Sequence, residues 1–168
     1  MRISAVIVMS MLLITALGCI EKAPSYEESF TGILFVGAYL NYTIESPLET
    51  TGYLYIKILD ENETHYKVYR ESVLRSKGVT SSTSSTRWEP KEKVLKWFVS
   101  WEPAGKARIY VHGKELLCSK YVNSSNGFEY VFYVYEEVPI RVEFTQKVDD
   151  RTVTIVYVLN STNVIKLS

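Results

Sequence analysis

Aliphatic residues alternate with polar or aromatic residues along most of this chain, and that period of two constrains its fold more than any other feature. The alternation covers 34–44, 53–58, 66–71, 140–145 and 152–157, with turn-forming residues between these segments. Neighbouring residues of a β-strand point to opposite faces, so each segment would bury one face and expose the other. The sequence therefore predicts a mostly β protein: a single antiparallel curled sheet, half-barrel or sandwich, of eight or nine strands with at most one short helix.

The aliphatic face of these strands predicts the core. We expect these side chains to be buried: Leu54, Ile56, Ile58, Ile140, Val142, Phe144, Val153 and Ile155. Turns are expected where Gly, Pro, Asn and Asp gather, at 46–52, 60–62, 103–105, 112–113, 123–127 and 149–150.

Two segments break the alternation. Residues 79–86 are almost wholly Ser and Thr, which indicates a polar loop or a sheet edge. Residues 90–101 fit a strand, but they also fit a helix that begins at Pro90, because four of their apolar residues have helical spacing: Val94, Trp97, Phe98 and Trp101. We favour one short helix here.

Composition and charge exclude several classes of protein. The 168 residues include 19 basic and 19 acidic side chains, so there is no basic excess to neutralise phosphates, and we expect no nucleic-acid partner. A hydrophobic content of 46% and an aromatic content of 13% exclude a disordered chain. With 2 cysteines, the chain has no disulfide framework and depends on its core.

Residues suited to catalysis are few. The strand pattern separates His112 from Cys118 by about 20 Å, too far for a hydrogen-bonded pair. His112 fits a hairpin turn with Gly113, and Cys118 fits a small strand residue. Glu136 and Glu137 are adjacent, so on a strand they would point to opposite faces. No metal-ligand spacing and no phosphate loop occurs, so we expect no enzyme, no catalytic residue, no cofactor and no metal.

The N-terminal segment is typical of an export signal. Arg2 is followed by apolar residues with no further charge until Glu21, and a run of this length is also the lower limit for a membrane-spanning helix. The run ends in Gly18-Cys19, which resembles the lipobox of prokaryotic lipoproteins, although Ala16 and Leu17 reverse its usual order.

The resemblance implies cleavage before Cys19 and a lipid on its sulfur. The chain would then consist of a signal peptide (1–18), a lipid-anchored tether (19–31) and a single antiparallel β domain (32–168). The alternative is an uncleaved N-terminal membrane helix. Both place the domain on the cell membrane, facing outside the cytoplasm, because Arg2 marks the inner side.

Asparagine-linked glycosylation signals are more frequent than chance, which would give about one. Sequons begin at Asn41, Asn62, Asn123 and Asn160. Glycosylation together with a lipobox indicates an archaeal-type envelope. Alternatively, Asn, Ser and Thr co-occur because all of them favour turns.

Tyrosine is abundant, with 13 residues. Several lie on the strand face opposite the aliphatic one: Tyr39, Tyr53, Tyr55 and Tyr69. Residues 130–135 are apolar or aromatic on both faces, so both need cover, either from 94–101 or from a ligand. A sheet of this kind could bind an apolar or sugar ligand, and the residues that we predict to do so are Tyr130, Tyr133, Tyr135, Trp97 and Trp101.

The predicted sheet, covering helix and lipid anchor together resemble, in outline and without a shared motif, the half-barrel lipoprotein carriers of the LolA kind. That resemblance implies a non-enzymatic envelope lipoprotein that binds an acyl chain or another apolar ligand between sheet and helix. The alternative is a structural or adaptor glycoprotein of the envelope that contacts another envelope protein and holds no small ligand.

Overall fold

The computed structural model describes residues 33–47, 49–95, 102–148 and 151–167. These residues form one antiparallel sheet of nine strands and, among those described, a single 3-10 turn, η1 (Lys91–Lys93). The strands are β1 (Tyr39–Ser46), β2 (Thr50–Glu61), β3 (His65–Ser76), β4 (Val79–Pro90), β5 (Glu102–Val111), β6 (Lys114–Ser125), β7 (Phe128–Tyr135), β8 (Val138–Val148) and β9 (Arg151–Thr162). The predicted fold class is therefore confirmed.

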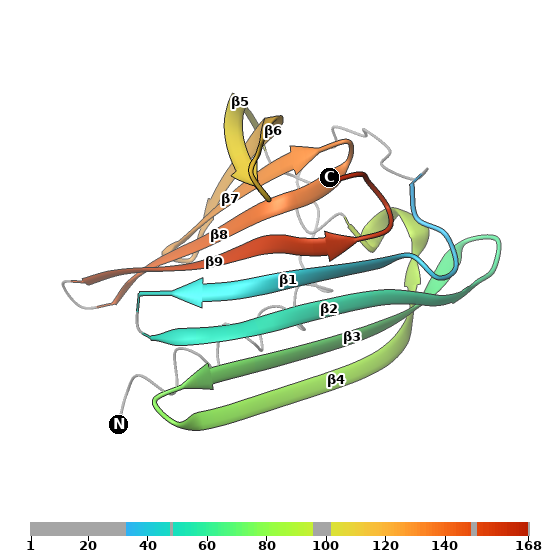
Figure 1. Ribbon diagram of the computed structural model, residues 1–168, viewed down its shortest axis with the longest axis horizontal. Helices are drawn as coiled ribbons and strands as arrows, with labels where there is room; N and C mark the ends of the chain where they lie inside the picture. Colours follow the sequence, from blue (N-terminus) through green and yellow to red (C-terminus); the bar gives the residue numbers. More distant parts are fainter. Residues whose placement is uncertain (1–32, 48, 96–101, 149–150, 168) are drawn as a thin grey trace.

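The sheet consists of two meanders that meet through their terminal strands. Its order is β4-β3-β2-β1-β9-β8-β7-β6-β5, so β1 pairs with β9, and β4 and β5 are the two edges (Figure 1). Cα atoms of β5 and β9 approach within 8 Å although β6, β7 and β8 lie between them in the order. The sheet is therefore strongly curled and remains unclosed.

Two-residue turns join several of the strands. At Lys77-Gly78, His112-Gly113, Asn126-Gly127 and Glu136-Glu137 both residues have positive φ, which matches the right-handed twist of the paired strands. Glu136 and Glu137, which on a strand would point to opposite faces, lie in the β7–β8 turn. The β7–β8 hairpin needs two left-handed residues there, and neither glutamate belongs to the residue types that favour such a turn.

Other boundaries also differ from the sequence pattern. The turn expected at 103–105 is a bulge inside β5, because Pro103 pairs with Tyr121 and Lys106 pairs with Ser119. The first strand begins at Tyr39 and not at 34, since Gly37 has a φ of 95°. Residues 79–86 are a strand at the sheet edge, as one of the two interpretations held. Of the helix favoured over 90–101, the described residues show only η1.

The core follows the predicted alternation. Leu54, Ile56, Ile58, Ile140 and Val142 are at most 2% exposed, as expected. The three remaining predicted core residues, Phe144, Val153 and Ile155, are half-buried. Phe144 and Ile155 nevertheless pack against the buried cluster, so the predicted face is the correct one.

Candidate functional site

One face of the sheet carries a continuous apolar surface, which we call the core face. It runs from Val68 on β3 through Ile56 and Leu40 to Val142 on β8 and Phe132 on β7, and all five side chains are at most 1% exposed. Register places them on one face, since Leu40 pairs with Ile56 and Phe132 pairs with Val142. The core face is therefore a continuous apolar surface that runs across the sheet from β3 to β7 and is covered in this structure.

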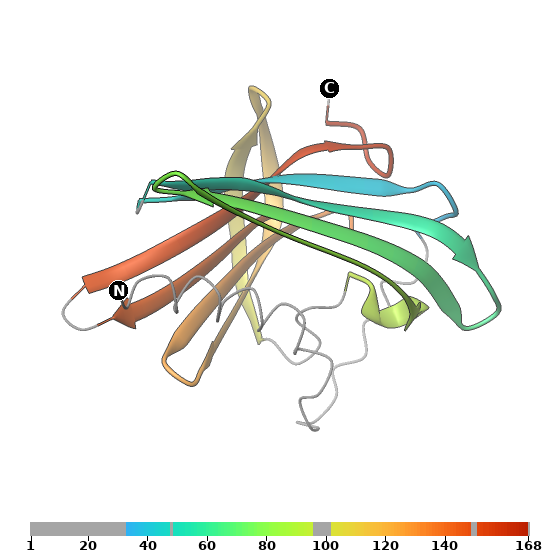
Figure 2. The same ribbon diagram turned by 90° about the horizontal axis from the view of Figure 1, so that it is seen from below.

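The connection that follows η1 begins against the core face. Val94 and Leu95 are 0% and 5% exposed and belong to the same buried cluster as the strand residues. Figure 2 shows η1 on the side toward which the two halves of the sheet bend. The first two residues of the segment predicted to cover the sheet therefore do so.

A buried ion pair fixes the start of this connection to the sheet. Arg70 donates from Nε and Nη2 to the two carboxylate oxygens of Glu89 at 3.1 and 2.8 Å, and Arg87 donates to the same carboxylate at 2.7 Å. Nη2 of Arg70 also donates to the backbone oxygen of Val94 at 3.3 Å. The side chains of Arg70 and Glu89 are only 12% and 11% exposed, so their ion pair lies largely out of solvent. We call this group of Arg70, Arg87 and Glu89 the clip.

The clip determines the charge state of Glu89. Burial alone would raise the pKa of its carboxyl, but the hydrogen bonds and charges of Arg70 and Arg87 outweigh burial and lower that pKa. Glu89 is therefore a carboxylate near neutral pH. The sequence analysis did not predict the ion pair of Arg70 and Glu89. The signal was present, because Arg70 lies on the same strand face as Tyr66 and Val68, and a charged side chain on an apolar face needs a partner of opposite charge.

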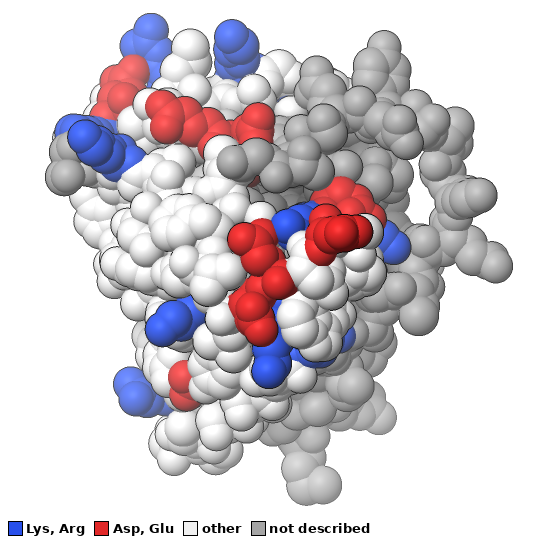
Figure 3. Space-filling model, turned by 90° about the vertical axis from the view of Figure 1, so that its right-hand side faces the viewer, with Lys and Arg blue, Asp and Glu red and all other residues white. Residues whose placement is uncertain are grey.

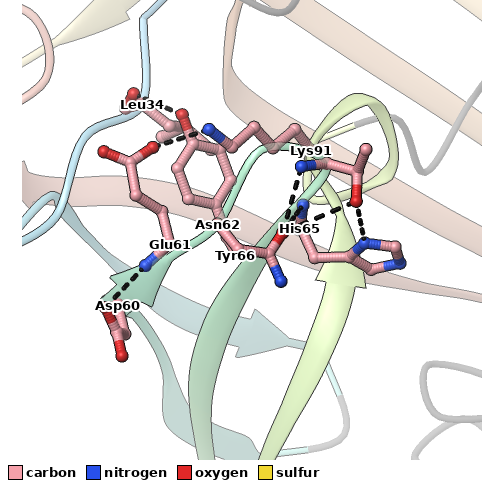
Figure 4. A network of polar contacts seen from close by, with 8 residues as sticks. Leu34, Asp60, Glu61, Asn62, His65, Tyr66 and Lys91 are labelled. Carbon is pink, nitrogen blue, oxygen red and sulfur yellow. Dashed lines mark hydrogen bonds and ion pairs between the residues drawn. The ribbon is translucent and has the colours of Figure 1, made fainter.

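A second set of contacts holds η1 to the β2–β3 turn (Figure 4). The Lys91 ammonium lies 2.7 Å from Oε2 of Glu61 and 4.8 Å from the centre of the Tyr66 ring. The backbone N–H of Lys91 donates to the Thr64 oxygen at 3.0 Å, and Tyr66 donates to the Leu34 oxygen at 2.7 Å. Lys91 thus contacts β2, the β2–β3 turn and the Tyr66 ring of β3, and Tyr66 in turn bonds the segment before β1.

The end of the molecule that carries these contacts is charged. Asp60, Glu61 and Glu63 are exposed at the β2–β3 turn, and Figure 3 shows acidic side chains gathered on this end with basic ones beside them. Both signs occur together here, as on an ordinary solvated surface. The apolar character of the candidate site therefore comes from the core face and not from this end.

The predicted ligand-binding tyrosines do not form one site. Tyr130 lies on the core face, 7% exposed, and its ring meets Phe144 edge-on at 5.3 Å. Tyr133 and Tyr135 lie on the opposite face and are half-buried. Trp97 and Trp101 lie outside the described residues. Of the three described members of this set, Tyr130 alone lies on the core face.

Strand β7 is buried on the core face and partly buried on the opposite face, so both faces have some cover, as its sequence indicated. Tyr130, Phe132 and Val134 on one face, and Val131 on the other, are each at most 7% exposed. Burial is the first cause of the raised pKa of both the Tyr130 and the Tyr133 hydroxyls, whereas a hydrogen bond with Glu136 is the first cause for Tyr135. All three are therefore neutral phenols near neutral pH.

The face opposite the core face carries the expected tyrosines. The ring of Tyr55 lies 6.1 Å from that of Tyr39 and 6.4 Å from that of Tyr69. Tyr53 and Tyr69 donate to the two oxygens of Glu71 at 3.0 and 3.2 Å. These half-buried side chains therefore contact one another through their rings and through Glu71, across β1, β2 and β3.

The four sequons occupy different local structures. Asn62 is exposed in the β2–β3 turn, where its Oδ1 accepts the N–H groups of Thr64 and His65 at 3.0 and 2.8 Å, and its amide nitrogen points away from the network (Figure 4). Asn160 is exposed at a bulge in β9. Asn41 and Asn123 are half-buried within strands. Asn41 shares a face with Tyr39, as expected, and none of the four is fully buried.

The residues considered for catalysis lie apart. Cys118 is fully buried, burial raises its pKa to about 11, and its S–H donates to the Leu116 oxygen at 3.5 Å. His112 is exposed in the β5–β6 turn.

No group of three potential metal ligands occurs in the described part of the chain. Within the same ranges, no helix has the length and apolarity needed to cross a membrane.

A depression of about 400 Å³, open to solvent, lies at one end of the sheet. Residues at the tip of the β6–β7 hairpin and on β8 and β9 line it, among them Phe128, Thr145 and Lys147. None of the predicted ligand-binding residues lines it, so it does not coincide with the site predicted from the sequence.

Comparison with known proteins gives a likeness of fold only. No family model and no curated protein matches the sequence. A solved structure, the crystal structure of MucB, is similar to 83% of this chain at 10% identity with a TM-score of 0.44. The chain spans 57% of the length of that MucB chain.

Proposed function

We propose that this chain is a non-enzymatic protein of the cell envelope that binds an apolar or lipid-like molecule between the core face and the connection 94–101. The observation that carries the proposal is the continuous apolar core face of an unclosed sheet, at which the connection begins with Val94 and Leu95. The described strands form one unclosed sheet without a second sheet to cover its apolar face, and Val94 and Leu95 begin to supply that cover. A ligand would lie on the core face beside Val94 and Leu95.

The construction of the cover supports a binding role. Its root is fixed by Arg70 and Lys91, while the strands beneath it present side chains without charge, such as Phe132 and Val142. Small-molecule sites are typically apolar with a few placed polar groups. Here the ion pair of Arg70 and Glu89 would be the polar group at one end of an apolar space.

The leader completes the proposal. Gly18-Cys19 supports anchoring through a lipid on Cys19, which would hold the β domain on the membrane and outside the cytoplasm. The sequons support N-glycosylation of an exported chain, with Asn62 as the best-placed acceptor. An apolar ligand and a membrane anchor suit each other, because acyl chains are available at the membrane surface.

Tryptophan quenching tests the proposal on the purified, delipidated full chain. The probe is a brominated fatty acid added as monomer, which quenches indole fluorescence at short range. We expect saturable quenching that weakens in Trp97→Phe and in Trp101→Phe. The matched control is Trp88→Phe on β4, where the indole is 47% exposed, and its quenching should equal that of the wild type. Absence of saturable quenching in the wild type would contradict the proposal.

A second candidate is a structural or adaptor glycoprotein that holds no small ligand. The observation in its favour is the continuity of the buried cluster, in which side chains of the sheet and of the connection pack on one another. The substitution Trp97→Ala separates the two candidates. If the role is adaptor, it should lower the free energy of unfolding by about 3–5 kcal/mol and leave the fatty acid without effect.

A further inference from the structure

The two edges of the sheet differ in how they are protected against pairing with another chain. Strand β5 carries Pro103, a bulge, and the charges of Lys106 and Arg108, which are the usual devices that block an edge. Strand β4 has none of these from Val79 to Thr86: no charge, no proline and no register shift against β3. Among the described strands none pairs with the outer side of β4, so this edge lacks the protection against a further strand that β5 has.

This edge is long and fully exposed. Every residue from Val79 to Trp88 is exposed to solvent. In an antiparallel edge strand, alternate residues direct their backbone N–H and C=O groups away from the neighbouring strand, here β3. Those outward groups are what a further antiparallel strand would bond.

The sequence of this edge reads the same in both directions. Residues 80–86 are Thr-Ser-Ser-Thr-Ser-Ser-Thr, with Thr83 at the centre. An identical strand paired antiparallel about Thr83 would set Thr opposite Thr and Ser opposite Ser at every position, and such cross-strand pairs are favourable. Only a second copy of the same strand matches this symmetry residue by residue.

Charges at the ends of the segment fit the same register. Continuing the pairing outward sets Arg87 opposite Val79 of the second copy, where β4 begins after the Lys77-Gly78 turn. No like charges meet, whereas like charges directly opposite each other would destabilise a pair of strands.

We propose that β4 is a self-association edge, through which two copies of this chain pair antiparallel about a two-fold axis at Thr83. The two nine-stranded sheets then form one continuous sheet. The interface is isologous, so both copies contribute the same residues. This inference is independent of any ligand on the core face.

Disulfide trapping in the purified full chain tests the register. At the two-fold axis the Cα atoms of residue 83 lie about 4.5–5.5 Å apart, which a disulfide spans. We expect mild oxidation of Thr83→Cys to give a covalent dimer on a non-reducing gel. The matched control is Thr80→Cys, also exposed on β4, whose two copies would lie about 20 Å apart. It should link no more than the wild type, which reports background from Cys19 and Cys118.

A mixture of Thr80→Cys and Thr86→Cys chains should link, because residue 80 faces residue 86 of the second copy. A charge substitution gives a second readout by light scattering. Thr83→Lys places two ammonium groups opposite each other and should weaken dimerisation at least ten-fold at low salt, whereas Thr86→Lys faces a threonine and should not. A monomeric wild type at all concentrations, or equal linking of the Thr80→Cys and Thr83→Cys variants, would overturn the proposal.

Discussion

The residue that most affects the candidate site is Arg70, because a single guanidinium joins β3, β4 and the start of the connection. Replacing Arg70 by Met leaves the Glu89 carboxylate in a site that is largely out of solvent. We expect the free energy of unfolding to fall by about 3–5 kcal/mol, as for other broken buried ion pairs. Urea denaturation measures the change.

The matched control is Arg141→Met. Arg141 pairs with Glu143 at 2.7 Å, but its side chain is 36% exposed, so the loss should be at most about 1 kcal/mol. Equal losses in the two variants would show that the buried ion pair of Arg70 and Glu89 contributes no more to the free energy of unfolding than an exposed pair.

Glu89 also makes the fold sensitive to acid. Burial raises the pKa of its carboxyl, but Arg70 and Arg87 outweigh burial and lower it below the ordinary value of 4.5. A group whose pKa is lower in the folded state stabilises the fold above its unfolded pKa, and that contribution is lost as the pH falls. The wild type should therefore lose stability between about pH 6 and pH 3 more steeply than Glu89→Gln. Parallel denaturation curves for the two chains against pH would contradict this.

At the scale of single elements, the alternation of β2 buries some of its aliphatic side chains and leaves others exposed to solvent. Ile56 is 0% exposed on the core face, whereas Leu59 near the end of the strand is 41% exposed. Ile56→Ala should cost about 2–5 kcal/mol of unfolding free energy, while Leu59→Ala should cost less than about 1 kcal/mol. Thermal denaturation of the two variants measures both, and the reverse order would mean that the core face is misassigned.

The local structure around each sequon predicts how readily its asparagine accepts a glycan. Glycans are bulky, so an exposed turn accepts one more readily than a half-buried strand position. We expect Asn62→Gln to remove one glycan mass from the chain purified from its native cell, and Asn123→Gln to change the mass less often. Intact-protein mass spectrometry reports this, and a chain that carries its glycan on Asn123 and not on Asn62 would refute the ranking.

The elements also show how far the sequence predicts this fold. Period-two alternation located most strands and their buried face, because side-chain direction in a strand depends on position alone. It gave no signal for the tight turn at Glu136-Glu137, and the Pro and Gly of 103–105 indicated a turn where β5 has a bulge, because turns and bulges depend on how a strand pairs with its neighbour. The clip of Arg70 and Glu89 escaped prediction for the same reason, since β3 and β4 had to be paired before the two charges could be matched.

At the scale of the whole molecule, an unclosed, curled sheet leaves one apolar face and two edges to be completed. The edge β5 is protected by its own sequence, and the connection after η1 begins to cover the face. In the account proposed here, an apolar ligand completes the core face and a second copy completes the edge β4. Both follow from the same geometry, but each can fail without the other.

The most direct test compares the mass of the full chain under native and denaturing conditions after gentle extraction from membranes. A lipid on Cys19 and any glycans are covalent and contribute to both masses, whereas a bound ligand is lost on denaturation. The account predicts that each chain is heavier in the native spectrum by one small apolar molecule. Equal masses per chain for a folded protein would contradict it.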